Sequence, residues 1–381
     1  MPSSTRGCAM TDIVIPAAAA GRSLWADAWN RLKANRAAMI SVYYLIFMAV
    51  ICIAGPWFTP HEFSTIYKDY NRVPPSLSSY PLPDKIGQAA EDAVKRARVE
   101  LSGWEERDGR IFITVTSAKP IDKRMTQYID RSDVFENAAV AEESPDGLKL
   151  TISADVERKY FYFGTDNSGR DLLTRTLSAG RVSLAIGLLA GLVAVFIGVL
   201  YGATAGFAGG KTDEVMMRIV DILYSLPFIF FVIMLVVFFG RNFVLMFLAV
   251  GAVLWLDMAR IVRGQALSIK RQEYVQAAEA LGVSQAGILL RHVVPNLLGP
   301  VVIYMTLLVP QVIILESFLS FLGLGVQEPM SSWGVLISQG AKNMPGANWL
   351  LFFPSLFLTT TLFALNFIGD GLRDALDPKD R

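Results

Sequence analysis

Six stretches of the chain are almost wholly apolar, and polar segments separate them. A helix needs about 20 apolar residues to cross a hydrocarbon core roughly 30 Å thick, and all six stretches meet or approach that length. They cover residues 37–58, 182–207, 222–239, 243–261, 297–321 and 348–368. The pattern predicts an all-α polytopic membrane protein with six transmembrane helices.

Two longer polar regions flank the first of these stretches. Residues 1–36 hold no apolar run long enough for a signal peptide, and Trp25–Arg36 has the pattern of a basic amphipathic helix that enters the first span. Residues 59–162 start with a cluster of prolines and then turn strongly charged. There the pattern predicts an amphipathic helix over Ala89–Leu101 and alternating strands over Ile111–Thr116 and Leu148–Val156. We expect a small α/β insertion, and a disordered loop is the alternative.

Basic residues indicate which ends of the spans face the cytoplasm. One set of connections is rich in them: Arg22, Arg31, Lys33 and Arg36 before the first span, Lys211 and Arg218 after the second, Arg260, Arg263, Lys270, Arg271 and Arg291 after the fourth, and Arg373, Lys379 and Arg381 after the sixth. The short loops on the other side hold Arg241 and Lys342. The positive-inside rule therefore predicts that both termini and the loop 264–296 are cytoplasmic and that the insertion 59–162 is extracytoplasmic.

The composition agrees with a membrane protein and excludes several other classes. Hydrophobic residues make up 53% of the chain and the mean hydropathy is +0.41, more than a soluble domain of this length needs. The net charge of +1 gives no indication of a basic surface that binds nucleic acid. Cys8 and Cys52 are not expected to pair, and His61 and His292 lie far apart, so no metal cluster is predicted. We expect no cofactor on this chain.

The loop 264–296 contains the most distinctive polar segment, YVQAAEALGVSQAGILLRHVVPN, over Tyr274–Asn296. Ala277 and Ala278 have small side chains, so a helix that contains them has a smooth surface that fits into a groove on another protein. Gly282 lacks a Cβ and is suited to end that helix with a left-handed residue. Arg291 and His292 then lead to Pro295, which costs no hydrogen bond where a helix begins.

This segment resembles the coupling loop of ABC importer permeases, in particular the dipeptide, oligopeptide and nickel branch. Three further strings are similar to signatures of that branch. They are FGTDNSGRD at 163–171, ESFLSFLGLG at 316–325 with Ser332-Trp333-Gly334 after it, and NFIGDGLRDALDP at 366–378. The tail and the string QEPMSSWG are most similar to the C-type subunit of oligopeptide permeases.

The resemblance implies a type I importer permease fold over residues 163–381 and a role in peptide import across the bacterial inner membrane. It implies as partners a second, related permease subunit, two ATPase subunits that bind ATP and Mg²⁺, and an extracytoplasmic peptide-binding protein. The chain itself would not be an enzyme. The helix that includes Glu273 and Tyr274 would dock on an ATPase.

The chain departs from the family pattern at two places. The motif has a glutamate before the two alanines, where this chain has Gln276, and Glu273 lies on the same helical side and is suited to compensate. The insertion 59–162 is also longer than the family usually has, so no role is transferred to it.

Two acidic residues lie in or near the spans, where ionisable groups usually face a bundle interior or a cavity. Glu316 either lines the pathway and meets a peptide amino group or is a structural hydrogen-bond partner, and the structural role is favoured. Asp257 is expected to pair with Arg260, one turn away.

The string before the second span also has two interpretations. Asp166 is expected to cap the helix that contains Arg170 to Leu177. Alternatively Asp166, Arg170 and Asp171 form a docking surface for a binding protein.

A further string, AGFAGGKT at 205–212, satisfies a relaxed phosphate-loop pattern. Such a loop follows a buried strand, whereas this one ends an apolar span and precedes two acidic residues. A nucleotide site is therefore not expected here.

Three alternatives to oligopeptide import stay open on the sequence. The same machinery would serve for dipeptides, nickel chelates or peptide-like antibiotics. An ion-coupled secondary transporter predicts inverted repeats and carboxylates deep in the spans, and the second, third and sixth spans contain no acidic residue. A membrane-anchored receptor would work mainly through the insertion.

Overall fold

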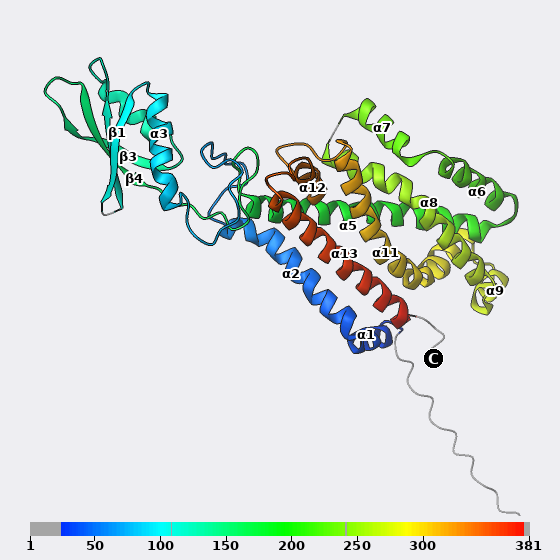
Figure 1. Ribbon diagram of the computed structural model, residues 1–381. Coiled ribbons are helices and arrows are strands. Elements are labelled where there is room, and N and C mark those ends of the chain that lie inside the picture. The colour runs from blue at the N-terminus through cyan, green and yellow to red at the C-terminus, as the bar shows by residue number, and fades with distance from the viewer. Residues whose placement is uncertain (1–23, 108, 241, 377–381) are drawn as a thin grey trace, which may run out of the picture.

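The computed structural model describes residues 24–107, 109–240 and 242–376, so residues 1–23 of the predicted N-terminal segment lie outside it. A long bundle of helices carries a small domain that projects from one end (Figure 1). The helices outside this domain are α1 (Leu24–Ala34), α2 (Arg36–Phe58), α5 (Leu172–Ala208), α6 (Gly210–Tyr224), α7 (Phe228–Phe239), α8 (Phe243–Lys270), α9 (Glu273–Ala280), α10 (Gln285–Ile288), a π-helical turn η3 (Leu289–Val293), α11 (Val294–Phe321), α12 (Trp333–Lys342) and α13 (Trp349–Leu376).

The prediction of a helical polytopic membrane protein is confirmed. Five helices are long and apolar enough to cross a membrane, and a sixth is added if the bent pair α6–α7 counts as one span. Several helices are longer than their apolar stretches: α5 begins at Leu172 instead of residue 182, and α8 continues to Lys270. Hydropathy marks only the part of a helix that lies in lipid, because polar residues continue the helix beyond it.

The third span, predicted over 222–239 with Pro227 inside it, is strongly bent at that proline. The helix α6 ends at Tyr224 and α7 starts at Phe228, and the two are bent by 84°. Pro227 lies in the break, where its ring removes a backbone donor and disfavours a helical conformation at Leu226. The apolar run therefore continues across a corner.

In the structure the insertion forms an α/β domain. Its elements are η1 (Pro83–Lys85), α3 (Ile86–Arg96), β1 (Glu100–Arg107), β2 (Arg110–Thr116), η2 (Lys123–Met125), α4 (Thr126–Asp130), β3 (Phe135–Glu143) and β4 (Lys149–Val156). The strands form an antiparallel sheet in the order β1-β2-β4-β3. The side chains of Ile111, Ile113 and Val115 point from β2 into a core with Ile152 and the helix α3.

Both strands predicted in the insertion, now β2 and β4, are confirmed, but β1 and β3 were not predicted. Their outward positions are mostly exposed and charged, which hides the alternation. The helix predicted to reach Leu101 ends at Arg96, and Arg98 takes a left-handed conformation before β1 begins.

Glycines set the distance between the two central helices of the bundle. Gly198, Gly202 and Gly206 lie four residues apart on α5 and face α8. A Cβ added to Gly202 would lie 2.3 Å from the carbonyl oxygen of Ala259. The backbones of α5 and α8 therefore pack directly on each other, as small residues allow in membrane helices.

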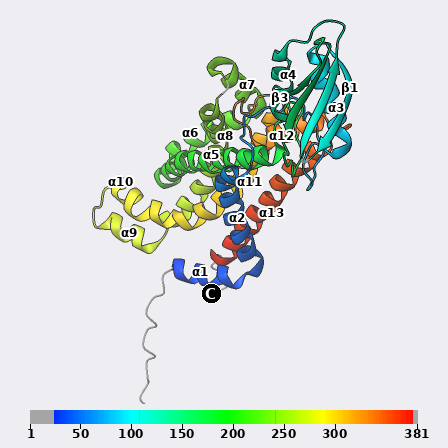
Figure 2. The same ribbon diagram turned by 90° about the vertical axis from the view of Figure 1, so that its left-hand side faces the viewer.

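The polar appendages lie at opposite ends of the bundle. The insertion precedes the N-terminal end of α5, and α9 packs against Phe207 near the other end. A helix of 37 residues is about 55 Å long, which exceeds the hydrocarbon core. Figure 2 shows α9 and α10 far from the insertion. The helix α1 packs on the end of α13 through Leu32 and Ala375, so both ends of the described chain meet at one place.

Candidate functional site

The segment predicted as a docking helix forms a short helix, a sharp turn and a second short helix. The helix α9 ends as predicted at Gly282, which has a φ of +80°. The N–H of Val283 donates to the carbonyl of Ala278 and the N–H of Gly282 to that of Glu279, which is the Schellman pattern of helix ends. Ser284 then caps α10, because its Oγ accepts the N–H of Gly287 at 3.3 Å.

The helix α9 has one face for the bundle and one for a partner. Val275 and Ala278 are buried in the cluster that contains Phe207. Ala277 lies on the exposed face, so the predicted alanine pair is divided between the two faces. Tyr274 is 45% exposed and Leu281, just before the glycine, is 84% exposed.

The polar residues of this segment are mostly free to contact another protein. Glu273 is exposed in the first turn of α9. Gln276, also exposed, donates from Nε2 to the carbonyl of Arg271 at 3.3 Å. Arg291 is exposed and His292 half-buried. Pro295 lies in the first turn of α11, as predicted, directly after the π-helical turn.

Salt bridges hold α6 against α8 beside this segment. The guanidinium of Arg263 donates two hydrogen bonds of 2.6 Å to Asp213. Lys270 donates to the carbonyl of Phe207 at 2.6 Å and so closes the end of α5. The connection between α5 and α8 is therefore fixed at the level where α9 begins.

The predicted pair of Asp257 and Arg260 is present only as an electrostatic attraction, without a direct salt bridge. Arg260 donates to Asp221 of α6 at 2.8 Å and lies over the ring of Tyr224, 4.2 Å from its centroid. The side chain of Arg260 points toward α6, whereas Asp257 lines a pocket between α8 and α11.

Glu316 is fully buried near the end of α11. Its Oε1 accepts hydrogen bonds of 2.6 Å from the hydroxyls of Ser320 and Ser332. Ser332 is the N-cap of α12, so the carboxyl joins two helices. This placement favours the structural role over contact with a peptide.

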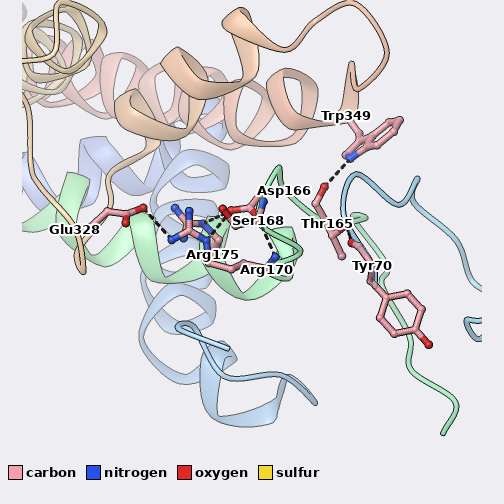
Figure 3. A network of polar contacts seen from close by, with 8 residues as sticks. All are labelled: Tyr70, Thr165, Asp166, Ser168, Arg170, Arg175, Glu328 and Trp349. Carbon is pink, nitrogen blue, oxygen red and sulfur yellow. Dashed lines mark hydrogen bonds and ion pairs between the residues drawn. The ribbon is translucent and has the colours of Figure 1, made fainter. Parts of the chain in front are cut away.

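The loop before α5 forms a charged network, which Figure 3 shows. Asp166 accepts the backbone N–H groups of Ser168 and Arg170 and the side chain of Arg170, all within 2.9 Å. The same Arg170 donates to Glu328 at 2.8 Å. The fully buried guanidinium of Arg175 lies 3.6 Å from Asp166.

The prediction that Asp166 caps the helix is wrong, because Asp171 does so. Asp171 accepts the backbone N–H and the hydroxyl of Thr174, each at 2.7 Å. Asp166 is occupied by its own loop and by the side chains of the two arginines. Burial raises the pKa of Asp171, although the bonds from Thr174 oppose that rise.

The loop also fastens the insertion to the bundle. The hydroxyl of Thr165 binds the carbonyl of Tyr70, and the indole of Trp349 donates to the carbonyl of Thr165 at 3.3 Å (Figure 3). Arg72 reaches Asn167 and Asn343. The start of the insertion, the loop and the start of α13 are thus held together.

Within 24–107, 109–240 and 242–376, no three His, Cys, Asp or Glu side chains are grouped to hold a metal. Lys211 and Thr212 of the phosphate-loop-like string lie in the first turn of α6, after a helix and not a strand.

Sequence reasoning missed several residues of the exposed surface next to α9. Leu281 and Leu290 are 84% and 59% exposed. The sequence did contain an indication of this surface, because these two large apolar residues lie in a segment that is otherwise polar. Tyr304 and Gln311, which share the pocket of Asp257, were hidden inside an apolar stretch.

Comparison with known proteins places the chain among transport components. The family described as binding-protein-dependent transport system inner membrane component matches residues 194–381, and the N-terminal TM domain of oligopeptide transport permease C matches residues 23–75.

Individual relatives agree with these family matches. The oligopeptide transport system permease protein OppC of Escherichia coli (strain K12) is 61% identical over 241 residues, which is 63% of this chain and 80% of that protein. OppC of Haemophilus influenzae is 43% identical over 361 residues, 95% of this chain and 90% of that protein. The dipeptide transport system permease protein DppC of Bacillus subtilis is 36% identical over 356 residues, 93% of this chain and 86% of that protein.

Proposed function

The chain belongs to the oligopeptide permease C branch of the inner membrane components of binding-protein-dependent transport systems, and on that premise we propose that it moves oligopeptides into the cell as one half of a type I permease pair. It is a non-catalytic permease subunit of an ABC importer. The second half is a related permease subunit, and two ATPase subunits supply the energy.

The observation that carries this proposal is the exposed face of α9 and the turn after it. Tyr274, Leu281 and Leu290 are large, apolar and exposed, and they lie in a segment fixed to the bundle by Val275 and Ala278. Exposed apolar groups of this kind mark a contact with another protein. Because the opposite face packs into the bundle beside α8 and α10, a push on α9 reaches the long helix α8 directly.

The positions of the two polar regions support the predicted orientation. The insertion and α9 lie at opposite ends of α5, so they face opposite sides of a membrane. We place α9, the start of α1 and the end of α13 in the cytoplasm. The insertion then faces outward together with the loop that contains Asp166, where a peptide-binding protein delivers its cargo.

Transport follows from differential binding of ATP to two states of the complex. ATP and Mg²⁺ bind to the ATPase subunits, and this chain binds neither. Closure of the ATPase pair moves α9, and α9 moves α8, which packs on α5 and α11. The cavity between the two permease subunits then opens outward, takes the peptide and releases it inward after hydrolysis.

A dipeptide is the second candidate substrate, favoured by the similarity to DppC. Uptake into liposomes distinguishes the candidates. The chain is reconstituted with the second permease subunit, the ATPases and the binding protein, and labelled peptides of two to eight residues are offered with and without ATP.

We expect uptake that requires ATP, survives an ionophore and extends to peptides longer than two residues. Uptake limited to dipeptides would contradict the proposal that oligopeptides are the substrate. Uptake driven by an ion gradient without ATP would contradict the proposal that the chain is part of an ATP-driven importer.

A further inference from the structure

Asp257 is a carboxylate inside the apolar stretch of a long helix. The helix α8 covers Phe243–Lys270, and Asp257 lies near the end of its apolar stretch, 243–261. A charged group at that depth is costly unless a partner compensates for its lost hydration. Among residues 24–107, 109–240 and 242–376, no side chain or backbone group forms a hydrogen bond or an ion pair with the Asp257 carboxylate.

The nearest cation in the sequence, Arg260, attracts the Asp257 carboxylate electrostatically but forms no direct ion pair with it. Arg260 is committed to Asp221 and to the ring of Tyr224. Glu316, the other acidic residue in these spans, contrasts with Asp257 because two serine hydroxyls of its own chain bind it. Asp257 is therefore arranged to meet a group from outside the described chain.

The pocket around Asp257 suits the end of a peptide. It has a volume of about 400 Å³ and lies between α8 and α11. Met258, Leu307 and Leu308 give it an apolar wall, and Arg260 lies at its edge. Tyr304 and Gln311 contribute polar groups from α11, and both flank the middle of Val294–Phe321. The pocket is therefore at mid-height of both helices.

The polar groups of the pocket match one chemical partner. The side chains of Tyr304 and Gln311, like that of Asp257, form no hydrogen bond with the described parts of the chain. A carboxylate, a phenol oxygen and an amide carbonyl offer three kinds of acceptor, and a protonated primary amine has three donors and one positive charge. A cation in this place also removes the cost of the isolated carboxylate.

We propose that Asp257, Tyr304 and Gln311 bind the amino terminus of the peptide during its passage. The inference rests on the proposed function and adds that this chain recognises the amino-terminal end of the peptide. Asp257 provides the charge, and the two α11 side chains orient the ammonium group. A peptide with a blocked amino terminus loses this contact.

The test compares two forms of one tripeptide, with a free and with an acetylated amino terminus. The complete complex in liposomes receives each form at saturating amounts of peptide-loaded binding protein, with binding to that protein measured separately. The wild type is expected to take up the free form about tenfold faster, as a charge-assisted hydrogen bond allows. In Asp257→Asn the ratio is expected to fall to about one, because uptake of the free form alone decreases.

Two further variants separate charge from structure. Asp257→Glu keeps the charge and is expected to retain most of the preference for the free amine. Glu214→Gln removes an exposed carboxylate from α6 and is expected to leave the ratio unchanged.

An unchanged ratio in Asp257→Asn would overturn the inference while leaving peptide import intact. Loss of the second permease subunit from purified Asp257→Asn would also overturn it, because the partner of Asp257 would then be a side chain of that subunit. Absence of ATP-driven uptake by the wild type would overturn the proposed function itself.

Discussion

The insertion and the helical bundle bury different kinds of residue. The core of the insertion consists of large aliphatic and aromatic side chains such as Ile113, Ile152 and Phe135. In the bundle, Gly198, Gly202 and Gly206 let the backbones of α5 and α8 touch, and large apolar side chains lie both in the interior, such as Met258, and on the outer surface.

The difference follows from the solvent. In water, burial of apolar area stabilises a fold. In lipid this gain disappears, and helices associate through close backbone contact and good packing. This chain is therefore stabilised by apolar burial in the insertion and by close backbone packing in the bundle. A substitution in either region is expected to act through the mechanism that stabilises that region.

The largest effect is expected from a cavity in the insertion. Ile113→Ala removes a fully buried side chain from β2 and is expected to cost about 2–5 kcal/mol. Limited trypsin digestion of the full chain in detergent should then cut within 59–162 while 163–376 stays intact. Phe112→Ala, on the half-buried face of the same strand, is the control. Equal loss of both regions would show that the insertion and the bundle unfold as one unit.

A smaller effect is expected from a methyl group between α5 and α8. Gly202→Ala places a Cβ against the backbone of Ala259, and such overpacking costs about 1–3 kcal/mol. The thermal midpoint of the purified chain, followed by size-exclusion chromatography, should fall. Gly264→Ala is matched, because an added Cβ meets nothing within 4 Å there. The same midpoint in both variants would argue against glycine-mediated packing.

The smallest effect is a pH dependence confined to the insertion. Burial tends to raise the pKa of Asp69, but hydrogen bonds from Arg96, Ser132 and the N–H of Asp133 outweigh it and lower the pKa from 3.8. The stabilisation from Asp69 is therefore complete above the ordinary pKa of an aspartate and is lost as the pH falls through the lowered value.

Hydrogen exchange, corrected for its intrinsic pH dependence, should show the insertion loosening in acid before α5 does. Asp69→Asn should remove part of this pH dependence, and Asp84→Asn, at an exposed position, should not. A wild-type profile identical to that of Asp69→Asn would exclude the carboxylate as the cause.

The sequence was informative where local chemistry alone decides the structure. The apolar lengths located α2 and α13, and Gly282 marked the end of α9, because span length and a left-handed residue need no tertiary information. Pro227 indicated a kink within a span, which neighbouring helices can accommodate, but the bend of 84° was not predicted because its size depends on tertiary packing.

The candidate site was predictable in its position but not in its contacts. The motif placed the docking segment at 273–296, yet which of Ala277 and Ala278 faces outward depends on how α9 packs against Phe207. The direct salt-bridge partner of Arg260 was mistaken for the same reason: Asp221 is 39 residues away along the chain. Spacing within one helix does not reveal a contact made by the next.

The central claim is that the exposed face beside α9 docks on an ATPase subunit, and co-purification tests it most directly. The chain is extracted in mild detergent as bait in three forms: wild type, Leu281→Glu and Leu77→Glu. The two leucines are almost equally exposed, at 84% and 86%, but Leu77 lies at the start of the insertion. We predict that the wild type and Leu77→Glu retain the ATPase subunits and that Leu281→Glu loses them. Equal retention by all three forms would contradict the account.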